Sequence, residues 1–355
     1  MSHNIASVLK RSGILSLGFL CFLIVQTASA LPFQAEEEVN PRLAAISRPD
    51  PEGVPTRVLV GGYLMDLSSI EDVDQTFTVD IYLWYTWHDP RLALKNVDAP
   101  GEPRNFSFQE IWHPFLDITN QRSLSKRYAE DLRVDAEGNV QFIQRYFGEL
   151  STPLMHKDFP FDSQDLEILI GSFRYGPEEV ELVVDEARTG RRDWLSITGW
   201  SVGQGTAEIT TEYVEVQDRH LARMDFSIPA KRYANFFFIK VIIPLCLIVL
   251  MAWLVLWIDP SAMGPQIGIP TSAVFALIVF LQRSAALLPR VAYLTRLDRF
   301  ILGVLILVFI TLGEAVTVTM LALKEKKELA ARIDRHARYI YLLVFLFIVL
   351  QAFVF

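Results

Sequence analysis

The last third of the chain consists of long apolar runs separated by short polar segments. The first and third runs are each long enough to cross about 30 Å of hydrocarbon as a helix, whereas the fourth, at the chain end, is shorter. The runs cover residues 236–258, 264–288, 300–323 and 338–355. The pattern predicts a membrane domain at 233–355 with four transmembrane helices, the last two joined by a short cytoplasmic loop at 324–337.

The second run differs from the others because small and polar residues interrupt it. At helical spacing, one face contains Gly268, Ser272, Phe275, Val279, Gln282 and Arg283. Such residues are costly against lipid, and a face of this kind is what a narrow water-filled pore requires. Close helix packing through small residues is the alternative. Pro270 leaves two registers open, since the helix either begins near Gly264 and bends at the proline or becomes regular only there.

Residues 57–232 show a different spacing of apolar and polar positions from that of the membrane domain. Apolar and polar positions alternate in "TFTVDIYLWYTW" (76–87) and in "RMDFSIPA" (223–230), with turn residues between such runs. Alternation of period two is the pattern of a strand with one buried face. Many short strands without a strong helical stretch favour an all-β, immunoglobulin-like sandwich. This domain ends at Arg232 with no linker before the first span, so we expect a rigid junction.

The N-terminus has the features of a secretory signal. Two basic residues precede an apolar run over 14–25, and small residues follow at 28–30. We therefore expect a cleaved signal peptide at 1–30 and a leader segment at 31–56, with a retained anchoring helix as the alternative. The β domain is predicted to be exported.

Charge divides the chain in the same way. Residues 31–232 contain 35 Asp and Glu against 20 Lys and Arg, whereas residues 233–355 contain 6 against 11. Basic side chains gather near the third polar connection, at Lys324, Lys326, Lys327, Arg332, Arg335 and Arg338. Because positive charge favours the cytoplasmic side, this loop is expected inside and the acidic domain outside. The chain is thus predicted to be a multi-pass membrane protein with the acidic domain outside.

The candidate chemistry is sparse. The sequence contains two cysteines, Cys21 and Cys246, so the exported domain has neither a disulfide framework nor a cysteine metal site. Its histidines are dispersed, and the chain has no HExxH motif or serine elbow, which argues against an enzyme. Two acidic clusters are read as solvated faces, with a divalent cation (Ca²⁺) site as the alternative. They comprise Glu71, Asp72 and Asp74, and Glu208, Glu212 and Glu215. No other cofactor and no nucleic-acid partner is expected.

Short motifs, in order along the chain, resemble those of one family. They are "WHDPRL" (87–92), "IWHPFLDITN" (111–120), "FPFDSQ" (159–164), "GSFRY" (171–175), "LLPRVAYLTRLD" (287–298) and "LGEAV" (312–316). From about Arg57 to Phe355 the chain resembles the pentameric ligand-gated ion channels, in the bacterial form that lacks the disulfide of the signature loop. The two loop cysteines of the family correspond to Thr152 and Leu166 here. Packing is therefore expected to hold this loop.

The resemblance implies a homopentamer in the lipid bilayer of a bacterial inner membrane, with the sandwich in the periplasm. Five second spans would line one axial pore. It also implies a site for a small-molecule or ion ligand between neighbouring sandwiches. The residues assigned to that site are Tyr82, Thr119, Arg133, Phe173 and Tyr213. Phe173 and Thr119 replace the usual tryptophan and tyrosine, so a strong cation–π cage is not expected. Plain core packing is the alternative for Phe173.

The resemblance also places the signature loop at the base of the sandwich, against the linker between the second and third spans. On the sandwich side the expected coupling residues are Glu71, Asp72, Phe159, Pro160, Phe161, Asp162 and Arg232. On the linker they are Leu288, Pro289 and Arg290. Opposite charges meeting there would permit alternative pairings, as a bistable gating element requires.

Together, these patterns predict a ligand-gated ion channel. The acidic outer domain would concentrate cations, whereas Arg283 near the outer mouth favours anions. Cation conduction is the expectation. A membrane-anchored periplasmic binding or assembly module that does not conduct is the other function class left open.

Overall fold

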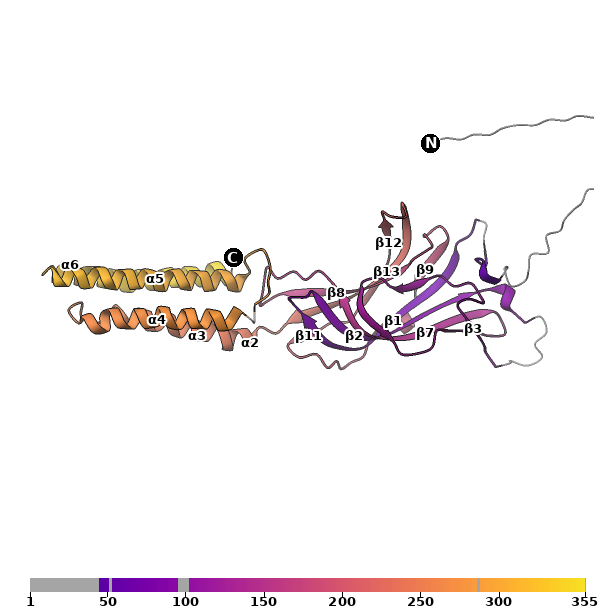
Figure 1. Cartoon of the computed structure of the whole chain (residues 1–355), viewed down its shortest axis with the longest axis horizontal. Coiled ribbons are helices and arrows are strands. Elements are labelled where there is room, and N and C mark those ends of the chain that lie inside the picture. The colour runs from indigo at the N-terminus through magenta and orange to yellow at the C-terminus, as the bar shows by residue number, and fades with distance from the viewer. Residues whose placement is uncertain (1–44, 51–52, 95–101, 286–287, 355) are drawn as a thin grey trace, which may run out of the picture. The chain divides into compact units, whose positions relative to one another are not determined.

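A computed structural model describes residues 45–50, 53–94, 102–285 and 288–354. The predicted signal peptide and most of the predicted leader segment lie outside the described residues. Within the described part, strands occupy the chain up to Arg232, and helices follow from Asn235 (Figure 1).

The strands form two sheets, one of eight strands and one of five. Their bounds are β1 Thr56–Glu71, β2 Thr76–His88, β3 Arg104–Ser107, β4 Leu116–Ile118, β5 Gln121–Lys126, β6 Asp131–Val134, β7 Asn139–Ser151, β8 Ser163–Ser172, β9 Val180–Val184, β10 Gly190–Arg191, β11 Trp200–Val202, β12 Thr206–Val214 and β13 Arg219–Arg232. The larger sheet has the order β10-β1-β2-β7-β6-β3, with β9 added to β1 and β5 to β7. The smaller has the order β11-β13-β8-β4, with β12 added to β13.

The two sheets pack against each other around one apolar core. Along β2 nearly every second residue is buried, as the alternation predicted. Ile81 of the larger sheet and Phe226 of the smaller are fully buried in the same cluster. A side chain at Gly62 of β1 would touch both Ile170 and Phe226 of the opposite sheet, which shows how closely the layers approach. The predicted β-sandwich is confirmed.

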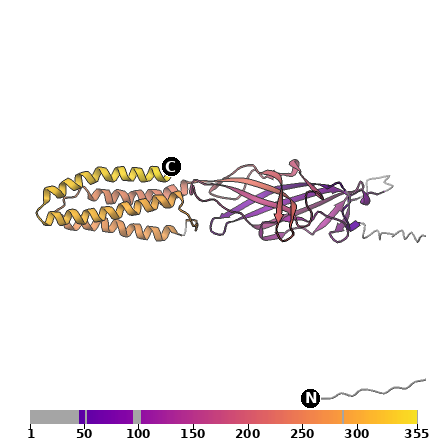
Figure 2. The same cartoon turned by 90° about the horizontal axis from the view of Figure 1, so that it is seen from above.

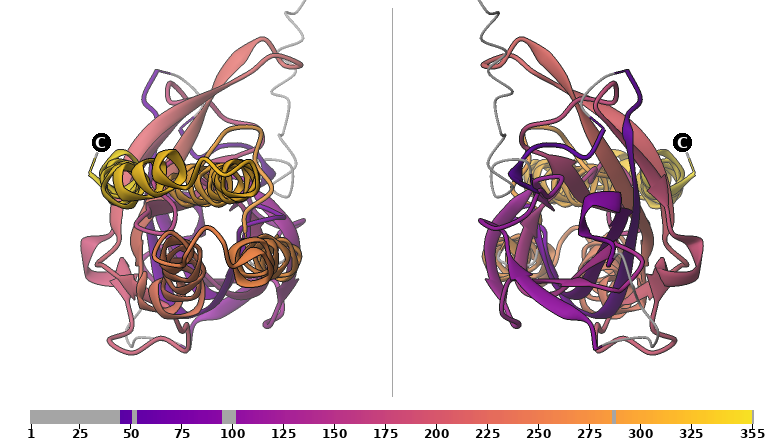
Figure 3. Two further views of the ribbon diagram at one scale, coloured as in Figure 1. Left: turned by 90° about the vertical axis from the view of Figure 1, so that its left-hand side faces the viewer. Right: turned by 90° about the vertical axis from the view of Figure 1, so that its right-hand side faces the viewer.

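Four helical segments are long and apolar enough to span a membrane: Asn235–Val255, Met263–Ser284, Arg296–Leu323 and Lys327–Phe353. The first comprises α2 (Asn235–Phe237), a π-helical turn (Phe238–Ile242) and α3 (Ile243–Val255). The others are α4, α5 and α6. Figures 2 and 3 show them lying alongside one another as a bundle. The prediction of four membrane helices after the sandwich is confirmed.

The predicted loop at 324–337 was wrong in its extent. Helix α6 begins at Lys327, so only Lys324–Lys326 separates it from α5. Hydropathy placed the boundary where charged residues begin, but Lys, Glu, Ala and Arg are good helix formers and continue the helix. Helix α5 also begins earlier than expected, at Arg296, because Thr295 and Asp298 form a capping box.

Of the two starting points left open by Pro270, the structure shows the one in which helix α4 begins before the proline. It begins at Met263 and contains Pro270 in its interior, ending at Ser284 rather than at 288. Proline has no N–H for the preceding turn. The next two hydroxyls, of Thr271 and Ser272, donate to carbonyls four residues earlier, at 2.7 and 2.8 Å. The helix thus continues through the proline.

Candidate functional site

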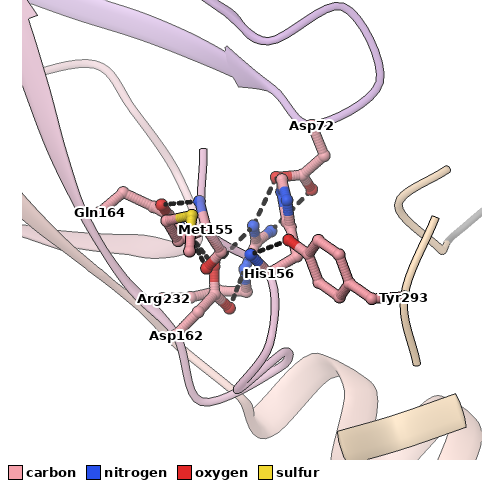
Figure 4. Close-up of polar contacts among 7 residues, drawn as sticks. All are labelled: Asp72, Met155, His156, Asp162, Gln164, Arg232 and Tyr293. Atoms are coloured by element: carbon pink, nitrogen blue, oxygen red, sulfur yellow. Dashed lines mark hydrogen bonds and ion pairs between the residues drawn. The ribbon is translucent and has the colours of Figure 1, made fainter. Parts of the chain in front are cut away.

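A buried ionic cluster lies where the last strand meets the first membrane helix (Figure 4). Arg232, the last residue of β13, donates from Nε to Asp162 Oδ1 at 2.9 Å and from Nη1 to Asp72 Oδ2 at 3.0 Å. Asp162 is 2 % exposed and Arg232 is 9 % exposed. The three charges were predicted to gather at this level, and the structure brings them into direct contact.

The guanidinium of Arg232 is also held by aromatic rings. It lies 4.1 Å from the centroid of Trp200 and 4.9 Å from that of Phe159. A planar guanidinium makes cation–π contacts of this kind while it binds carboxylates in its own plane. Arg232 is thereby fixed on both its edge and its faces.

His156 adds a fourth polar group, one that the sequence analysis did not select. Its Nε2 lies 3.0 Å from Asp72 Oδ1, and its backbone N–H donates to the hydroxyl of Tyr293 at 2.9 Å (Figure 4). Burial works to raise the pKa of Asp72, but hydrogen bonds from His156 and Arg232 outweigh it and hold that pKa below 3.8. Asp72 is therefore a carboxylate at neutral pH, bound from two sides.

Gln164 connects the two ends of the β7–β8 loop (152–162) through hydrogen bonds. The resemblance implies that a disulfide is missing from this segment. The Gln164 amide accepts from the Met155 N–H at 2.8 Å and donates to the Met155 carbonyl at 3.0 Å. It also donates to Asp162 at 2.6 Å. Gln164 is 3 % exposed, so these bonds are shielded from water. Hydrogen bonds of a buried amide therefore hold the loop, in addition to the packing that was expected.

The β7–β8 loop is hydrogen bonded to the start of α5. The backbone N–H of Arg296 donates to the Lys157 carbonyl at 3.1 Å, and that of Leu297 donates to the Phe159 carbonyl at 3.2 Å. The Arg296 side chain binds Asp158 at 2.7 Å. The first N–H groups of a helix have no partner inside it, so they are available for these bonds.

The two phenylalanines of the loop have different surroundings. Phe159 is fully buried within the apolar cluster of the membrane helices and packs edge-on against Phe237 at 4.7 Å. Phe161 is 44 % exposed and contacts Phe353, near the end of α6, at 5.8 Å. Only Phe159 is therefore an anchor inside the helical core.

The described contacts of the loop add partners to those predicted on the linker. The described hydrogen bonds and ring contacts of the β7–β8 loop go to the linker and helices at Tyr293, Arg296, Leu297, Phe237 and Phe353. Leu288 is half-buried against the helical cluster, Pro289 is buried, and Arg290 and Glu71 are exposed. The start of α5 supplies N–H donors to the loop, and direct roles for Leu288, Pro289 and Arg290 stay a prediction.

The six predicted pore residues all lie on one exposed side of α4 within the single chain. They are Gly268, Ser272, Phe275, Val279, Gln282 and Arg283. Phe275 is 69 % exposed and Val279 is 43 % exposed. The opposite side packs inside the subunit through Gln266, Pro270, Ala273, Val274, Leu277 and Ser284. An apolar side chain that is this exposed on a membrane helix is available to a pore, a neighbouring subunit or lipid.

The predicted ligand residues fall into two groups. Phe173, just after β8, and Tyr213 of β12 are each 51 % exposed. The turn after β12 reaches Phe173, because the Gln217 amide donates to its carbonyl at 3.4 Å. Thr119 is half-buried, and its hydroxyl donates to the Leu169 carbonyl at 3.3 Å. These residues belong to the smaller sheet and its loops, and the exposure of Phe173 rules out plain core packing.

Tyr82 and Arg133 lie on the other sheet and line one cavity of about 580 Å³. Trp84, Tyr128 and Asp131 also line it. Tyr82 stacks on Trp84 at 5.2 Å, and its hydroxyl is hydrogen bonded to that of Tyr128 at 2.8 Å. The cavity therefore combines an aromatic wall with one acidic and one basic side chain.

Among the described residues, no group of three or more His, Cys, Asp or Glu side chains is arranged to hold a metal ion. Two members of the predicted acidic clusters are engaged elsewhere, Asp72 by Arg232 and Glu212 by Arg223 at 3.5 Å. Calcium binding stays an untested prediction.

An extracellular sandwich with a loop hydrogen bonded to a four-helix membrane bundle defines a receptor of the ligand-gated channel class. Residues 41–233 match the model of the neurotransmitter-gated ion-channel ligand binding domain, and residues 241–332 match that of the neurotransmitter-gated ion-channel transmembrane region. The chain belongs to the neurotransmitter-gated ion-channel family. Its members are ligand-gated, multi-pass channels rather than enzymes, as the sequence analysis expected.

Known relatives come from bacteria and animals. The chain is 26 % identical over 292 residues to a proton-gated ion channel of Gloeobacter violaceus, covering 82 % of this chain and 81 % of that one. It is 24 % identical over 289 residues to the glycine receptor subunit beta of Rattus norvegicus, covering 79 % of this chain and 58 % of that one. A gamma-aminobutyric acid receptor subunit beta of Caenorhabditis elegans is 24 % identical over 264 residues, or 71 % of this chain and 46 % of that one.

Proposed function

We propose that this chain forms a homopentameric, cation-conducting channel of a bacterial inner membrane, opened by a ligand that binds in the periplasm. The observation that carries this proposal is the pair of hydrogen bonds from the first N–H groups of α5 to the Lys157 and Phe159 carbonyls. Any shift of the β7–β8 loop must then move the start of α5 or break those bonds. The junction is thereby able to pass a rearrangement of the sandwich to the membrane helices.

The ligand is proposed to bind between subunits. Phe173 and Tyr213 on one subunit would face the cavity of Tyr82 and Arg133 on the next. In the single chain the two groups belong to different sheets. Phe173, Tyr213 and Tyr128 are exposed, and Tyr82 is half-buried. Asp131 and Arg133 offer opposite charges in that cavity, which suits a small ligand carrying both an anionic and a cationic group. A ligand opens the channel only as far as it binds the open arrangement more tightly than the closed one.

The gate is proposed to lie at Phe275 and Val279. Five copies of these exposed apolar side chains around an axis would form a ring narrow enough to exclude water and ions when closed. A tilt of α4 would widen that ring. The excess of acidic residues in 31–232 would raise the local concentration of cations at the outer mouth.

The test is a recording from purified full-length protein in planar bilayers, preceded by a mass measurement of the detergent-solubilised particle. The ligand panel comprises protons, calcium, small amines, and amino acids with both charges. We expect a particle of five chains and unitary currents that appear with one member of the panel and reverse near the cation equilibrium potential. A pentamer that never conducts would favour the anchored binding or assembly module, and reversal near the anion potential would overturn the selectivity.

A further inference from the structure

Two acidic side chains meet inside the membrane bundle. Glu314 of α5 and Asp334 of α6 lie close enough for the charge state of each to act on the other. Asp334 is 1 % exposed. All four carboxyl oxygens are buried, and none has a hydrogen-bond partner among the described residues. Ionisable groups within membrane spans are costly and usually serve a function.

The pair lies towards the side of the membrane opposite the β-sandwich. Glu314 is nine residues before the end of α5 at Leu323, and Asp334 is seven residues after the start of α6 at Lys327. At 1.5 Å per residue both are roughly 10 to 14 Å from the ends that flank the short connection between these helices. The two carboxyl groups therefore stand at about the same depth.

Among the described residues, no cation is hydrogen bonded to either carboxyl group. The positive charge that acts on Asp334 is that of Arg338, whose Nε donates to the Leu256 carbonyl at the end of α3, at 2.8 Å. Its guanidinium also lies 4.4 Å from the ring centroid of Trp257. Asp259, in the connection between α3 and α4, adds a further negative charge to the field at Asp334.

Two carboxylates that share a buried site cannot both stay ionised at low cost, as the paired aspartates of acid proteases illustrate. With a proton between them, one carboxyl donates to the other and only one charge remains. We propose that Glu314 and Asp334 bind one proton between them and form a proton site in each subunit, linking α5 to α6. This site is separate from the proposed ligand site and from the predicted pore residues.

The helices joined by this proton also meet at the gating junction. Arg296 at the start of α5 donates to the carbonyl of Phe353 at the end of α6, at 3.2 Å. Phe353 in turn contacts Phe161 of the β7–β8 loop. Loss of the proton would place two charges between α5 and α6 and loosen their packing. The proton site would thereby adjust the junction from the opposite membrane side.

The experiment uses the full-length protein in lipid nanodiscs and does not depend on conduction, so its failure is distinguishable from failure of the proposed function. Infrared spectra and thermal unfolding are recorded from neutral to alkaline pH. In the unaltered chain we expect a protonated-carboxyl band that disappears as the pH rises, together with a fall in melting temperature. The variants are Glu314→Gln, Asp334→Asn and both together, with Glu325→Gln in the exposed connection as the matched control.

The double variant should lack the titrating carboxyl band and the associated loss of stability, while Glu325→Gln should keep both. Each single variant should also keep its melting temperature at alkaline pH, because two facing charges can no longer form. The same band and the same fall in melting temperature in the unaltered and doubly substituted proteins would overturn the proposal. Binding of a sodium ion in place of the proton would also overturn the proposal. It would be detected as a sodium-dependent rise in melting temperature that occurs in the unaltered protein alone.

Discussion

The backbone N–H of Leu297 donates to the carbonyl oxygen of Phe159 at 3.2 Å, which joins the second residue of α5 to the tip of the β7–β8 loop. The side chain of the same phenylalanine is buried in the apolar cluster of the helices. Phe159 thus belongs to the sandwich by sequence and to the membrane domain by packing. Main chain and side chain both resist separation of the two domains.

Phe159→Ala is expected to uncouple ligand binding from current. Truncation of a buried phenylalanine costs about 3–5 kcal/mol of stability, and the cavity here would open between the loop and Phe237. Phe159→Leu retains much of the volume and should keep the protein folded while weakening the coupling. The measurement is the ligand concentration for half-maximal current, beside ligand binding to the same protein.

Phe161→Ala is the matched control for that experiment, because the same residue type in the same loop is 44 % exposed. Since its side chain is partly exposed and its ring meets Phe353 at the end of α6, its effect on unfolding should stay below that of Phe159→Ala. Equal losses of coupling from the two alanine variants would show that burial of the loop tip does not carry the signal.

The ionic cluster makes a second prediction. Removal of one partner from a buried, hydrogen-bonded ion pair typically costs about 3–5 kcal/mol, because the other charge stays buried without a partner. Asp162→Ala should therefore destabilise the folded chain by about this amount through Arg232, and Asp162→Asn by less. Chemical unfolding followed by tryptophan fluorescence is the measurement.

Glu130→Gln is the control for the ionic cluster. Its carboxylate binds Lys126 at the surface, where both side chains are well exposed. Pairs of that kind contribute at most about 1 kcal/mol. A loss from Asp162→Ala no larger than that from Glu130→Gln would contradict a structural role for the buried cluster.

Some of this junction was predictable from the sequence, and some was not. The opposite charges of Asp72, Asp162 and Arg232 were visible in the sequence, and the family resemblance predicted that they meet. The bond between His156 and Tyr293 joins residues 137 positions apart, and no local pattern marks either one. Such contacts depend on how the domains dock, so a single sequence carries almost no signal for them.

The same limit applies to the different burial of the two loop phenylalanines and to the predicted start of α6. Phe159 and Phe161 flank one proline and look equivalent in the sequence, but the turn directs only the first into the helical cluster. In α6, the buried face of the helix continues into the segment rich in charged residues, where Ala330 and Asp334 are buried. Average hydropathy cannot detect a helix whose exposed side is charged.

The third prediction concerns pH. Burial, together with the charge of Arg174, lowers the pKa of His113 to about 4, and its ring stacks between Phe108 and Phe115. An unfolded histidine titrates near 6.5, so between about 4 and 6.5 the unfolded chain binds more protons than the folded one. The free energy of unfolding should therefore fall as the pH drops through that window, by an amount on the order of 3 kcal/mol.

Unfolding of the full chain at a series of pH values measures this slope. His113→Gln should flatten it, whereas His88→Gln, at an exposed position, should leave it unchanged. A slope that survives in His113→Gln would assign the acid sensitivity to other groups.

The fourth prediction tests the gate. Val279→Ser places a hydroxyl in the proposed apolar ring and should raise the current in the absence of ligand, because a polar ring stays wet at smaller diameters. Phe275→Ala should do the same by widening the ring. Val316→Ser is the control, since Val316 on α5 is 40 % exposed, close to the 43 % of Val279. Basal currents that rise equally in Val279→Ser and Val316→Ser would place the gate elsewhere.

The fifth prediction concerns the ligand cavity. Arg133 is an exposed residue of β6 with its side chain at the 580 Å³ cavity, beside the aromatic wall of Tyr82 and Trp84. If the agonist carries an anionic group, Arg133→Gln removes a charge-assisted hydrogen bond worth about 1.5–3 kcal/mol, or roughly a 10- to 150-fold loss of affinity. Arg57→Gln, at an exposed position of β1, makes the same change of charge outside the cavity and should leave the affinity unchanged.

Equal losses from the two variants would mean that Arg133 acts only through the general field of the domain. Unchanged affinity in both would leave the aromatic wall as the recognition element, and Tyr82→Ala would then cause the larger loss.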